Sequence, residues 1–405
     1  MNRHPEPADF APPPAPSDLA RWDEADRADR PARVGRLRER FAAAGIDAYF
    51  GLRREHMRYL TGFTLADGEE KVAGHSGQFL VGAEETVVLA DSRYTIQARR
   101  EAPESRVDET GYDLPARWGA LCESVGARRL GVEAAIMSQA LWTRLAAAAP
   151  TVELVPIEGW LEADRATKEP TEIERIAAAC AVADRALAGL LLAIRPGVTE
   201  ADLALDLEWR IRTGGAEALA FDVACLGGPE AALPHGAPGE RPVRSGAVLL
   251  FDFGAQVAGY RSDMTRTLFV GEPAERDLDV YDVVWRAQRA AIDLLEARLA
   301  EGNGLPDGRT IDAAARAVIE EDGRFPAYGH GLGHGIGLAT HEQPSLSRSA
   351  PETPVPSRTV FSVEPGIYLE GETGVRIEDL VAIDADAGHL RRLTRFPSEV
   401  VVVGS

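Results

Sequence analysis

Hydrophobic and polar positions divide the chain into three stretches. Residues 1–30 combine prolines with alternating acids and arginines and contain no apolar run, so we expect a polar, disordered leader there. Residues 31–162 alternate helical and strand patterns, which predicts a first α/β domain. Residues 163–405 present the same order of elements twice, two helices and then apolar strands, which predicts a second, α+β domain built from two related halves.

The expected elements of the first domain follow from periodicity and from turn residues. They are helices over 33–44, 114–126 and 138–148 and strands over 47–52, 78–82 and 86–90. In the second domain, Thr171 and Glu174 have capping-box spacing before a helix that reaches about residue 194, and Thr199 begins the next helix. Later helices are expected over 275–301 and from about residue 310.

Two strands of the second domain each carry one aspartate among apolar residues. Asp252 lies in the run Val-Leu-Leu-Phe-Asp-Phe, where burial of a carboxylate is unfavourable unless a cation compensates it. A hairpin centred between Val257 and Ala258 would set Asp252 opposite Asp263, with Cβ atoms roughly 4.5–5.5 Å apart. Two carboxylates at that spacing can share a metal ion.

The second half repeats this arrangement with glutamates. A hairpin centred near Gly371 would set Glu364 opposite Glu378. Between the halves lies a glycine-rich loop, Gly-His-Gly-Leu-Gly-His-Gly-Ile-Gly, which contains His330 and His334. The spacing of its glycines is not that of a nucleotide-binding loop. We interpret the glycines as allowing the backbone and the imidazole rings to pack closely around a site.

Four carboxylates and one histidine form an oxygen-rich ligand set that suits Mn²⁺, Co²⁺, Zn²⁺ or Fe²⁺. One divalent ion would leave the four negative charges poorly compensated, whereas two ions would neutralise them. We therefore expect two divalent ions.

Composition narrows the class of protein. Apolar residues make up 45% and charged residues 27%, which is typical of a globular protein. The 64 acids exceed the 44 basic residues and give a net charge of −20, which argues against binding to nucleic acid or to an anionic membrane surface. Three cysteines, odd in number and widely spaced, fit a reducing cytoplasm. We therefore expect a cytoplasmic protein.

Taken in order, Asp252, Asp263, His334, Glu364 in Ser-Val-Glu-Pro-Gly and Glu378 in Val-Arg-Ile-Glu-Asp resemble the M24 metallopeptidase family of the pita-bread fold. That family includes methionine aminopeptidase, aminopeptidase P and prolidase. The first domain resembles the creatinase-like N-terminal domain of aminopeptidase P and prolidase through two motifs. These are Arg-Glu-His-Met-Arg-Tyr-Leu-Thr-Gly-Phe at 54–63 and Asp-Ser-Arg-Tyr at 91–94.

The resemblance implies a dinuclear site, with Mn²⁺ the leading choice of metal. One ion would be held by Asp263, His334, Glu364 and Glu378, and the other by Asp252 with Asp263 and Glu378 bridging. It also implies roles for three outer histidines and for one arginine. His235, His341 and Glu364 would be catalytic, and His235, His330, His341 and Arg376 would contact the substrate.

In the hypothesis, Glu364 handles the proton, His341 stabilises the oxyanion, and His235 positions the amide or its leaving nitrogen. Arg376 lies on the same strand face as Glu378, so a plain salt bridge is an equal alternative for it.

By likeness to the family, the expected reaction is hydrolysis of the Xaa-Pro bond at the N-terminus of peptides, as in aminopeptidase P. The alternative is an Xaa-Pro dipeptidase, or prolidase. Many prolidases have an arginine directly after the proline of His-Glu-x-Pro, where this chain has Ser345, with Arg348 nearby. A homodimer is expected by likeness as well.

Other functions on the same fold fit the sequence less well. Methionine aminopeptidases usually lack the first domain. Creatinase-like hydrolases work without metal and lack the full set of acids. Relatives that only bind partner proteins typically lack some of the metal-ligating residues. All five ligand positions are filled here.

Overall fold

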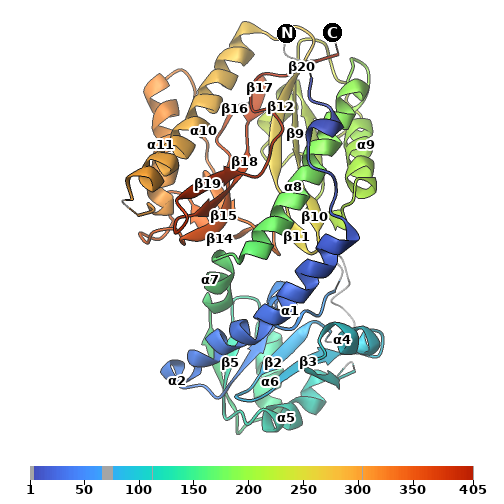
Figure 1. The fold of residues 1–405 in the computed structure, drawn as a ribbon, viewed down its shortest axis with the longest axis vertical. Coiled ribbons are helices and arrows are strands. Elements are labelled where there is room, and N and C mark those ends of the chain that lie inside the picture. The colour runs from blue at the N-terminus through green and yellow to red at the C-terminus, as the bar shows by residue number, and fades with distance from the viewer. Residues whose placement is uncertain (1–3, 66–75, 112, 303, 405) are drawn as a thin grey trace. The chain divides into compact units, whose positions relative to one another are not determined.

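The computed structural model describes residues 4–65, 76–111, 113–302 and 304–404. These residues form two compact units (Figure 1). One unit consists of residues 20–164, and the other joins residues 1–19 to residues 165–405.

The unit of residues 20–164 contains a mixed six-stranded sheet in the order β4-β3-β2-β1-β5-β6. The expected strand pair is present as antiparallel β2 and β3, with Phe79 opposite Val88. Phe50 on β1 and Trp118 on α5 make an edge contact in the core, with ring centroids 4.8 Å apart. The strands are β1 (Ala48–Gly51), β2 (Gln78–Val81), β3 (Thr86–Ala90), β4 (Arg106–Glu109), β5 (Arg129–Glu133) and β6 (Glu153–Ile157).

Helices surround the strands of this unit. Asp113 and Ser138 cap α5 and α6 through their side chains, as expected for residues of these types at helix N-termini. The helices are α2 (Phe41–Ala44), α3 (Arg54–Thr61), α4 (Thr95–Glu101), α5 (Leu114–Ser124), α6 (Gln139–Ala148) and α7 (Trp160–Ala166), the last of which ends just beyond the unit.

The described part of the leader, residues 4–30, is folded, whereas disorder was expected over residues 1–30. It contains the short helix η1 (Pro7–Asp9) and the start of α1 (Pro16–Glu39), which buries Trp22. The charges of α1 compensate one another, because Asp26 accepts from Arg30 at 2.9 Å and from Arg33 at 2.8 Å. The scarcity of apolar residues in this stretch therefore does not prevent it from folding.

The first 19 residues belong to the second unit, with residues 165–405. Phe10 stacks on Phe396 with ring centroids 6.3 Å apart, and Arg185 donates to the carbonyl oxygen of Pro7 at 2.7 Å. An extended, proline-rich segment is thus held by side chains from both ends of the unit.

The second unit has the two expected halves. In Figure 1, α8 and α9 lie on one side of its strands, and α10 and α11 lie on the other. The two main sheets have the orders β20-β12-β9-β8 and β14-β13-β15-β18-β19. The helices are α8 (Pro170–Leu190), which continues as η2 (Leu191–Ala193), α9 (Glu200–Thr213), α10 (Glu275–Glu301) and α11 (Gly308–Asp322).

The strands of the first half are β7 (Ala218–Leu219), β8 (Ala224–Gly227), β9 (Val248–Phe253), β10 (Ala255–Val257), β11 (Tyr260–Arg261) and β12 (Met264–Val270), with the short helix η3 (Gly228–Ala232). Those of the second half are β13 (Gly333–Gly335), β14 (Glu342–Leu346), β15 (Arg358–Val363), β16 (Gly366–Leu369), β17 (Thr373–Arg376), β18 (Asp379–Asp384), β19 (His389–Arg392) and β20 (Val402–Val403). The last of these, β20, pairs with β12 in the sheet of the first half.

The first acid hairpin has a different register from the expected one. Val257 pairs with Tyr260, so the turn is Ala258-Gly259, with φ of 47° and 83°. Positive φ at both turn residues is the geometry of a tight type I′ turn, which Gly259 adopts without steric penalty. As a result, Asp252 lies opposite Thr265 instead of Asp263.

The second acid hairpin has the expected register. Gly366 pairs with Arg376 in the β16–β17 ribbon, and Val363 pairs with Asp379 in the β15–β18 pair. Glu364 and Glu378 therefore fall opposite each other between these two ladders.

Arg266 on β12 joins the two halves beneath the acid hairpins. Its side chain is 1% exposed and pairs with Asp379 at 2.6 Å. It also donates to the carbonyl oxygens of Glu378 and Thr265, and to that of Phe396 at 2.6 Å. One guanidinium thus holds β12, β18 and the C-terminal segment together.

Asp184 of α8 is a second buried acid that ties down the C-terminal segment. Its carboxylate accepts from the backbone N–H groups of Arg395 and Phe396, each at 2.9 Å. Burial nevertheless raises the pKa of Asp184 from 3.8 to about 7. A carboxyl whose pKa is raised by folding favours the folded state at low pH and loses that advantage as pH rises through the raised pKa.

We therefore expect stability to fall between about pH 4 and pH 7 on account of this one group. At 1.36 kcal/mol per pKa unit, the loss is on the order of 4 kcal/mol. The measurement is urea unfolding from pH 4 to pH 8 for the wild type and for Asp184→Asn. If the free energy of unfolding changed with pH in the same way for both proteins, Asp184 would not be the cause of the fall.

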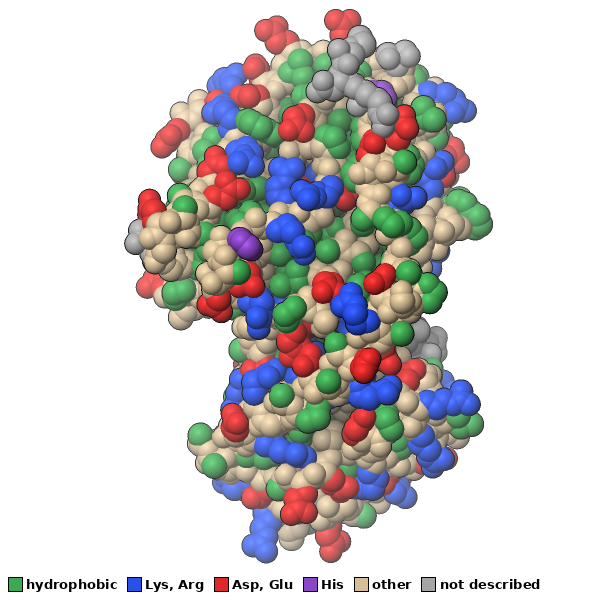
Figure 2. Space-filling model, in the orientation of Figure 1, with side chains coloured by type: hydrophobic (Ala, Val, Ile, Leu, Met, Phe, Trp, Pro, Cys, Tyr) green, Lys and Arg blue, Asp and Glu red, His purple; other side chains and the backbone are tan. Residues whose placement is uncertain are grey.

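On the face shown in Figure 2, acidic and basic side chains are interspersed over the surface. Among the described residues, one helical stretch, Pro170–Ala193, has the length and apolar composition to cross a membrane. Two thirds of its apolar window is buried, as in the core helix of a folded domain.

Candidate functional site

A cavity of about 680 Å³ in the second unit collects most of the polar residues singled out from the sequence. That volume is within the range of small-molecule sites. Its walls come from both acid hairpins, from the glycine-rich loop and from the loop before β9. The candidate residues on its walls are His235, Asp252, Asp263, His330, His334, His341, Glu364, Arg376 and Glu378.

Three of these side chains form a compact group of potential metal ligands. One atom each from Asp263, His334 and Glu378 lies within 4.8 Å of the others. Nε2 of His334 is 3.7 Å from Oδ2 of Asp263 and 3.3 Å from Oε1 of Glu364. The two acid pairs and the loop histidine are therefore brought together from five separate strands or loops.

The acids at this site are poorly compensated by the protein. Oδ1 of Asp252, Oδ1 of Asp263 and Oε1 of Glu378 are buried, and none accepts a hydrogen bond from a described residue. Burial, together with the neighbouring carboxylates, raises the pKa values of Asp263 and Glu378 well above their ordinary values. Buried carboxylate oxygens without donors are the donor set that a divalent cation satisfies.

His334 is oriented for coordination through Nε2. Its Nδ1 lies 3.1 Å from the carbonyl oxygen of Gly335, which fixes the proton on Nδ1 if that nitrogen donates. Although burial opposes the effect, Glu364 raises the pKa of His334 to about 9. In the same way, although burial opposes it, the hydrogen bond from His334 lowers the pKa of Glu364 to about 2.

Close packing requires the glycines of the glycine-rich loop, as the sequence suggested. A Cβ on Gly333 would lie 2.0 Å from the carbonyl oxygen of Ser362, and one on Gly335 would lie 2.0 Å from that of Gln343. The strand that carries His334 can therefore lie between β14 and β15 only because its flanking residues have no side chain.

Arg376 makes the salt bridge that was the alternative to substrate contact. Its Nη2 donates to Asp252 at 2.6 Å, its Nε donates to Oγ1 of Thr265 at 2.9 Å, and Thr265 donates to Glu378 at 2.8 Å. The side chain is 4% exposed. Arg376 thus orients two of the acids through one planar guanidinium.

The outer histidines differ in their surroundings. His330 lies 3.0 Å from the hydroxyl of Tyr368, and burial lowers its pKa. His341 is exposed, with its ring centroid 4.2 Å from that of His334. Partial desolvation of its ring against the cavity wall, followed by the charge of His334, lowers the pKa of His341. His235 is exposed at the cavity wall.

Sequence reasoning missed several residues of the site. Thr265 bridges Arg376 and Glu378, and Tyr368 lies between His330 and Arg376, whose Nη1 donates to it at 3.0 Å. Arg261 also lines the cavity. The available signal was the period of two along a strand, since Arg261 and Thr265 flank Asp263 at i−2 and i+2.

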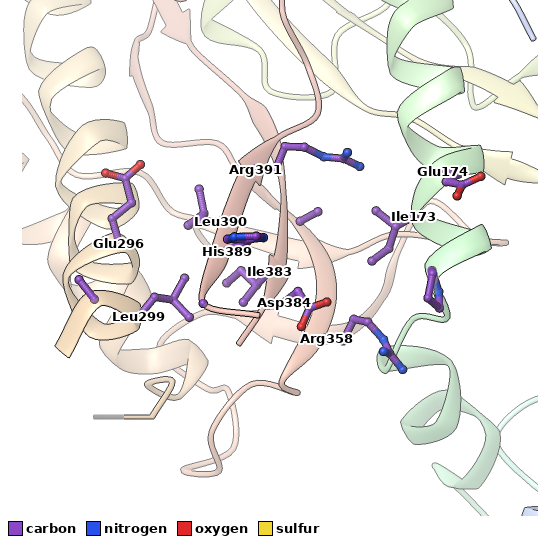
Figure 3. A pocket seen from close by; sticks show the side chains of 14 residues that line it. Ile173, Glu174, Glu296, Leu299, Arg358, Ile383, Asp384, His389, Leu390 and Arg391 are labelled. Carbon is purple, nitrogen blue, oxygen red and sulfur yellow. The ribbon is translucent and has the colours of Figure 1, made fainter. Parts of the chain in front are cut away.

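A second cavity, of about 750 Å³, lies between α8, α10 and the β18–β19 pair (Figure 3). Ile173, Leu299 and Leu390 contribute apolar surface, and acids and bases alternate around them. Its size exceeds that of the first cavity, but the compact ligand group lies in the first.

Known proteins share both parts of this fold. Residues 174–385 match the model of metallopeptidase family M24, and residues 33–167 match that of the creatinase/prolidase N-terminal domain. The chain is 32% identical to an uncharacterised peptidase of Bacillus subtilis over 92% of this chain and 100% of the relative.

Solved structures agree with these matches. The Xaa-Pro dipeptidase from Bacillus anthracis has a TM-score of 0.83 at 31% identity, over 92% of this chain and 100% of its own. The X-Pro aminopeptidase from Thermotoga maritima has a TM-score of 0.77 at 33% identity, over 89% and 98%. Together these findings define a pita-bread metallopeptidase with a creatinase-type N-terminal domain.

The chain belongs to the metallopeptidase family M24. The resemblance noted in the sequence and the expected fold class, including the duplicated halves, are therefore confirmed, and the protein is a peptidase of that family.

Proposed function

We propose that the protein is a metal-dependent exopeptidase that hydrolyses the bond between an N-terminal residue and a following proline. The observation that carries the proposal is the cluster of Asp263, His334 and Glu378, with buried carboxylate oxygens that have no donor among the described residues. The names of the similar solved structures, an Xaa-Pro dipeptidase and an X-Pro aminopeptidase, support the choice of bond.

The residues of the site fit two divalent ions. Asp263, His334, Glu364 and Glu378 would hold one, and Asp252, with Asp263 and Glu378 shared, would hold the other. Mn²⁺ is our first choice, followed by Co²⁺, Zn²⁺ and Fe²⁺. When bound, such ions act as Lewis acids on a carbonyl group and activate water.

The remaining side chains would handle protons and the substrate. Glu364, which accepts from Oγ of Ser362 at 2.9 Å, would be the proton carrier, because its carboxylate lines the cavity and its lowered pKa keeps it ionised before the substrate binds. A prolyl nitrogen leaves only after it is protonated, so such a carrier is required. His341, with its lowered pKa, would donate a neutral N–H to the oxyanion, and His235 would position the amide.

Two specificities remain candidates. Ser345, in place of an arginine after the proline of His-Glu-Gln-Pro, favours action on longer peptides, as in an aminopeptidase P. The dipeptidase name of the Bacillus anthracis structure favours dipeptides. Arg348, the nearby arginine in the sequence, pairs with Glu320 at 3.0 Å and is 68% exposed, so it does not supply a cation to the cavity.

Digestion of a peptide library tests the proposed function. The chain is stripped with a chelator, reloaded with Mn²⁺ and incubated with peptides that carry either proline or alanine at the second position. We expect release of the N-terminal residue only from the proline set and only after metal is added back. Equal release from both sets, or activity in the stripped protein, would contradict the proposal.

The homodimer and the cytoplasmic location stay predictions. The three cysteines, Cys122, Cys180 and Cys225, are buried and unpaired.

A further inference from the structure

Helix α9 has apolar side chains on two opposite faces. Leu203, Leu207 and Ile211 are buried in the second unit. On the opposite face, Leu205 and Trp209 are 68% and 66% exposed, and they lie one helical turn apart, so their side chains adjoin. Figure 1 shows α9 at the outer edge of this unit. Because tryptophan is mostly buried in folded proteins, a continuous apolar surface that includes it indicates contact with another molecule.

One charged residue lies at each end of this apolar surface. Asp202 precedes it, Arg212 follows it, and both side chains are exposed. With 3.6 residues per turn, the four side chains fall within about 80° of the helix circumference. We call them the α9 stripe: Asp202, Leu205, Trp209 and Arg212. Asp202 accepts from the backbone N–H of Thr199 at 3.4 Å, and Arg212 has no ion pair with a described residue, so both charges are available to a partner.

The α9 stripe is symmetric in its spacing. Leu205 and Trp209 lie two residues on either side of position 207. Asp202 and Arg212 lie five residues on either side of it. Two copies of α9 that pack antiparallel about a twofold axis at this position therefore bring Leu205 against Trp209 of the second copy, and Asp202 against Arg212 of the second copy. The intervals of three and four residues are those of the contact positions in paired helices.

The two charges favour this arrangement over the alternatives. Parallel helices would set each charge against the same charge of the second copy, which is repulsive. A lipid surface would accept Leu205 and Trp209, but helices that lie in a membrane surface have lysine and arginine beside their apolar face. Here an acid lies at one end, and the chain has a net charge of −20. The α9 stripe therefore fits a second copy of the chain better than a membrane.

We propose that the α9 stripe is an interface between two copies of this chain, which pack their α9 helices antiparallel. The family resemblance predicts a homodimer without assigning a surface to it, and the α9 stripe supplies one. The proposal does not depend on the proposed hydrolysis, because none of the four residues lines the cavity of the candidate site.

The size of the contact sets the expected strength of association. Helix α9 has 14 residues and is therefore about 21 Å long. One pair of helices of this length buries less than the roughly 1,200–2,000 Å² of a standard interface. We therefore expect the two copies to dissociate at micromolar concentrations, on the order of 1–100 µM.

Analytical ultracentrifugation of the full chain tests the interface. In about 0.15 M salt, repulsion between the two acidic copies is screened beyond about 8 Å. We expect the molecular mass to double between about 0.1 and 100 µM, and Trp209→Gln to raise the midpoint concentration about tenfold or more. Leu192→Gln is the matched control, since Leu192 is 93% exposed and lies outside α9, and it should leave the midpoint unchanged. A mass that does not double, a midpoint unmoved by Trp209→Gln, or an equal shift in the control would overturn the proposal.

Exchange of the two charges tests the antiparallel register. Asp202→Arg and Arg212→Asp each place like charges against one another at both ends of the contact, so each variant alone should associate more weakly than the wild type. An equimolar mixture of the two variants should regain the midpoint of the wild type, because the two copies then have opposite charges at both ends. Failure of the mixture to associate more tightly than either variant would overturn the antiparallel pairing. Urea unfolding of each variant checks that α9 remains folded, and Trp209→Gln tests the contact without altering the first turn of the helix.

Discussion

Replacing Asp263 with asparagine is expected to abolish hydrolysis and metal binding together. The amide keeps the shape of the side chain but removes a negative charge from the cluster formed with His334 and Glu378. Metal ions contribute several kcal/mol to such reactions, and each 1.36 kcal/mol corresponds to a factor of ten in rate. We therefore expect kcat/KM to fall about 10³-fold or more.

The same substitution should stabilise the metal-free protein. Burial and the neighbouring acids raise the pKa of Asp263 well above its ordinary value, which means that its charged form is disfavoured in the folded state. Removing that charge should increase the free energy of unfolding near pH 7, measured in urea with a chelator present. Asp293→Asn, on the exposed surface of α10, is the control. Full turnover by chelator-treated Asp263→Asn would refute the metal-dependent site.

Replacing Arg266 with methionine should strongly lower the free energy of unfolding. The substitution leaves Asp379, whose side chain is 0% exposed, buried without its main cation, and leaves the carbonyl oxygens of Glu378 and Phe396 without their donor. Breaking a buried ion pair by removing one partner typically costs about 3–5 kcal/mol. We expect a fall of that size in the free energy of unfolding.

Two companion variants make this test specific. Arg289→Met removes an exposed pair with Asp293 and should change stability by no more than about 0.5 kcal/mol. Adding Asp379→Leu to Arg266→Met should recover part of the loss, because the buried charge is then gone as well. A loss below about 1 kcal/mol for Arg266→Met alone would show that Asp379 finds other compensation.

Periodicity and turn residues were sufficient to predict most of the second unit. The α10 boundaries, the Thr199 cap and the register of the glutamate hairpin all follow from local signals. The cap of α8 was placed two residues late, since Glu169 and Glu172 form the capping box instead of Thr171 and Glu174. Several acids lie near the start of this helix, so the sequence alone does not decide which residue is the N-cap.

The aspartate hairpin shows how an error in the predicted strand register can still leave two acids on the same face of the sheet. Its turn lies at Ala258-Gly259. Because alanine rarely adopts a positive φ, the sequence does not predict a turn that includes Ala258. The resulting error moved the cross-strand partner of Asp252 by two residues, from Asp263 to Thr265. Because side chains alternate along a strand, a shift of two keeps both acids on one face.

Burial and long-range contacts could not be predicted from local composition. Asp26 and Arg30 are four residues apart on α1, a spacing that permits an ion pair, but the sequence does not show that both side chains are buried. The hydrogen bond from Thr265 to Glu378 joins residues that are 113 positions apart.

The assignment of residues 1–19 to the second unit has a consequence for synthesis. Residues 20–164, which have their own core, lie in the chain between this segment and its partners Arg185 and Phe396. Because domains fold during synthesis in the order in which they are made, residues 20–164 can fold before either partner is available. The stacking of Phe10 on Phe396 can therefore form only after most of the peptidase unit has been synthesised.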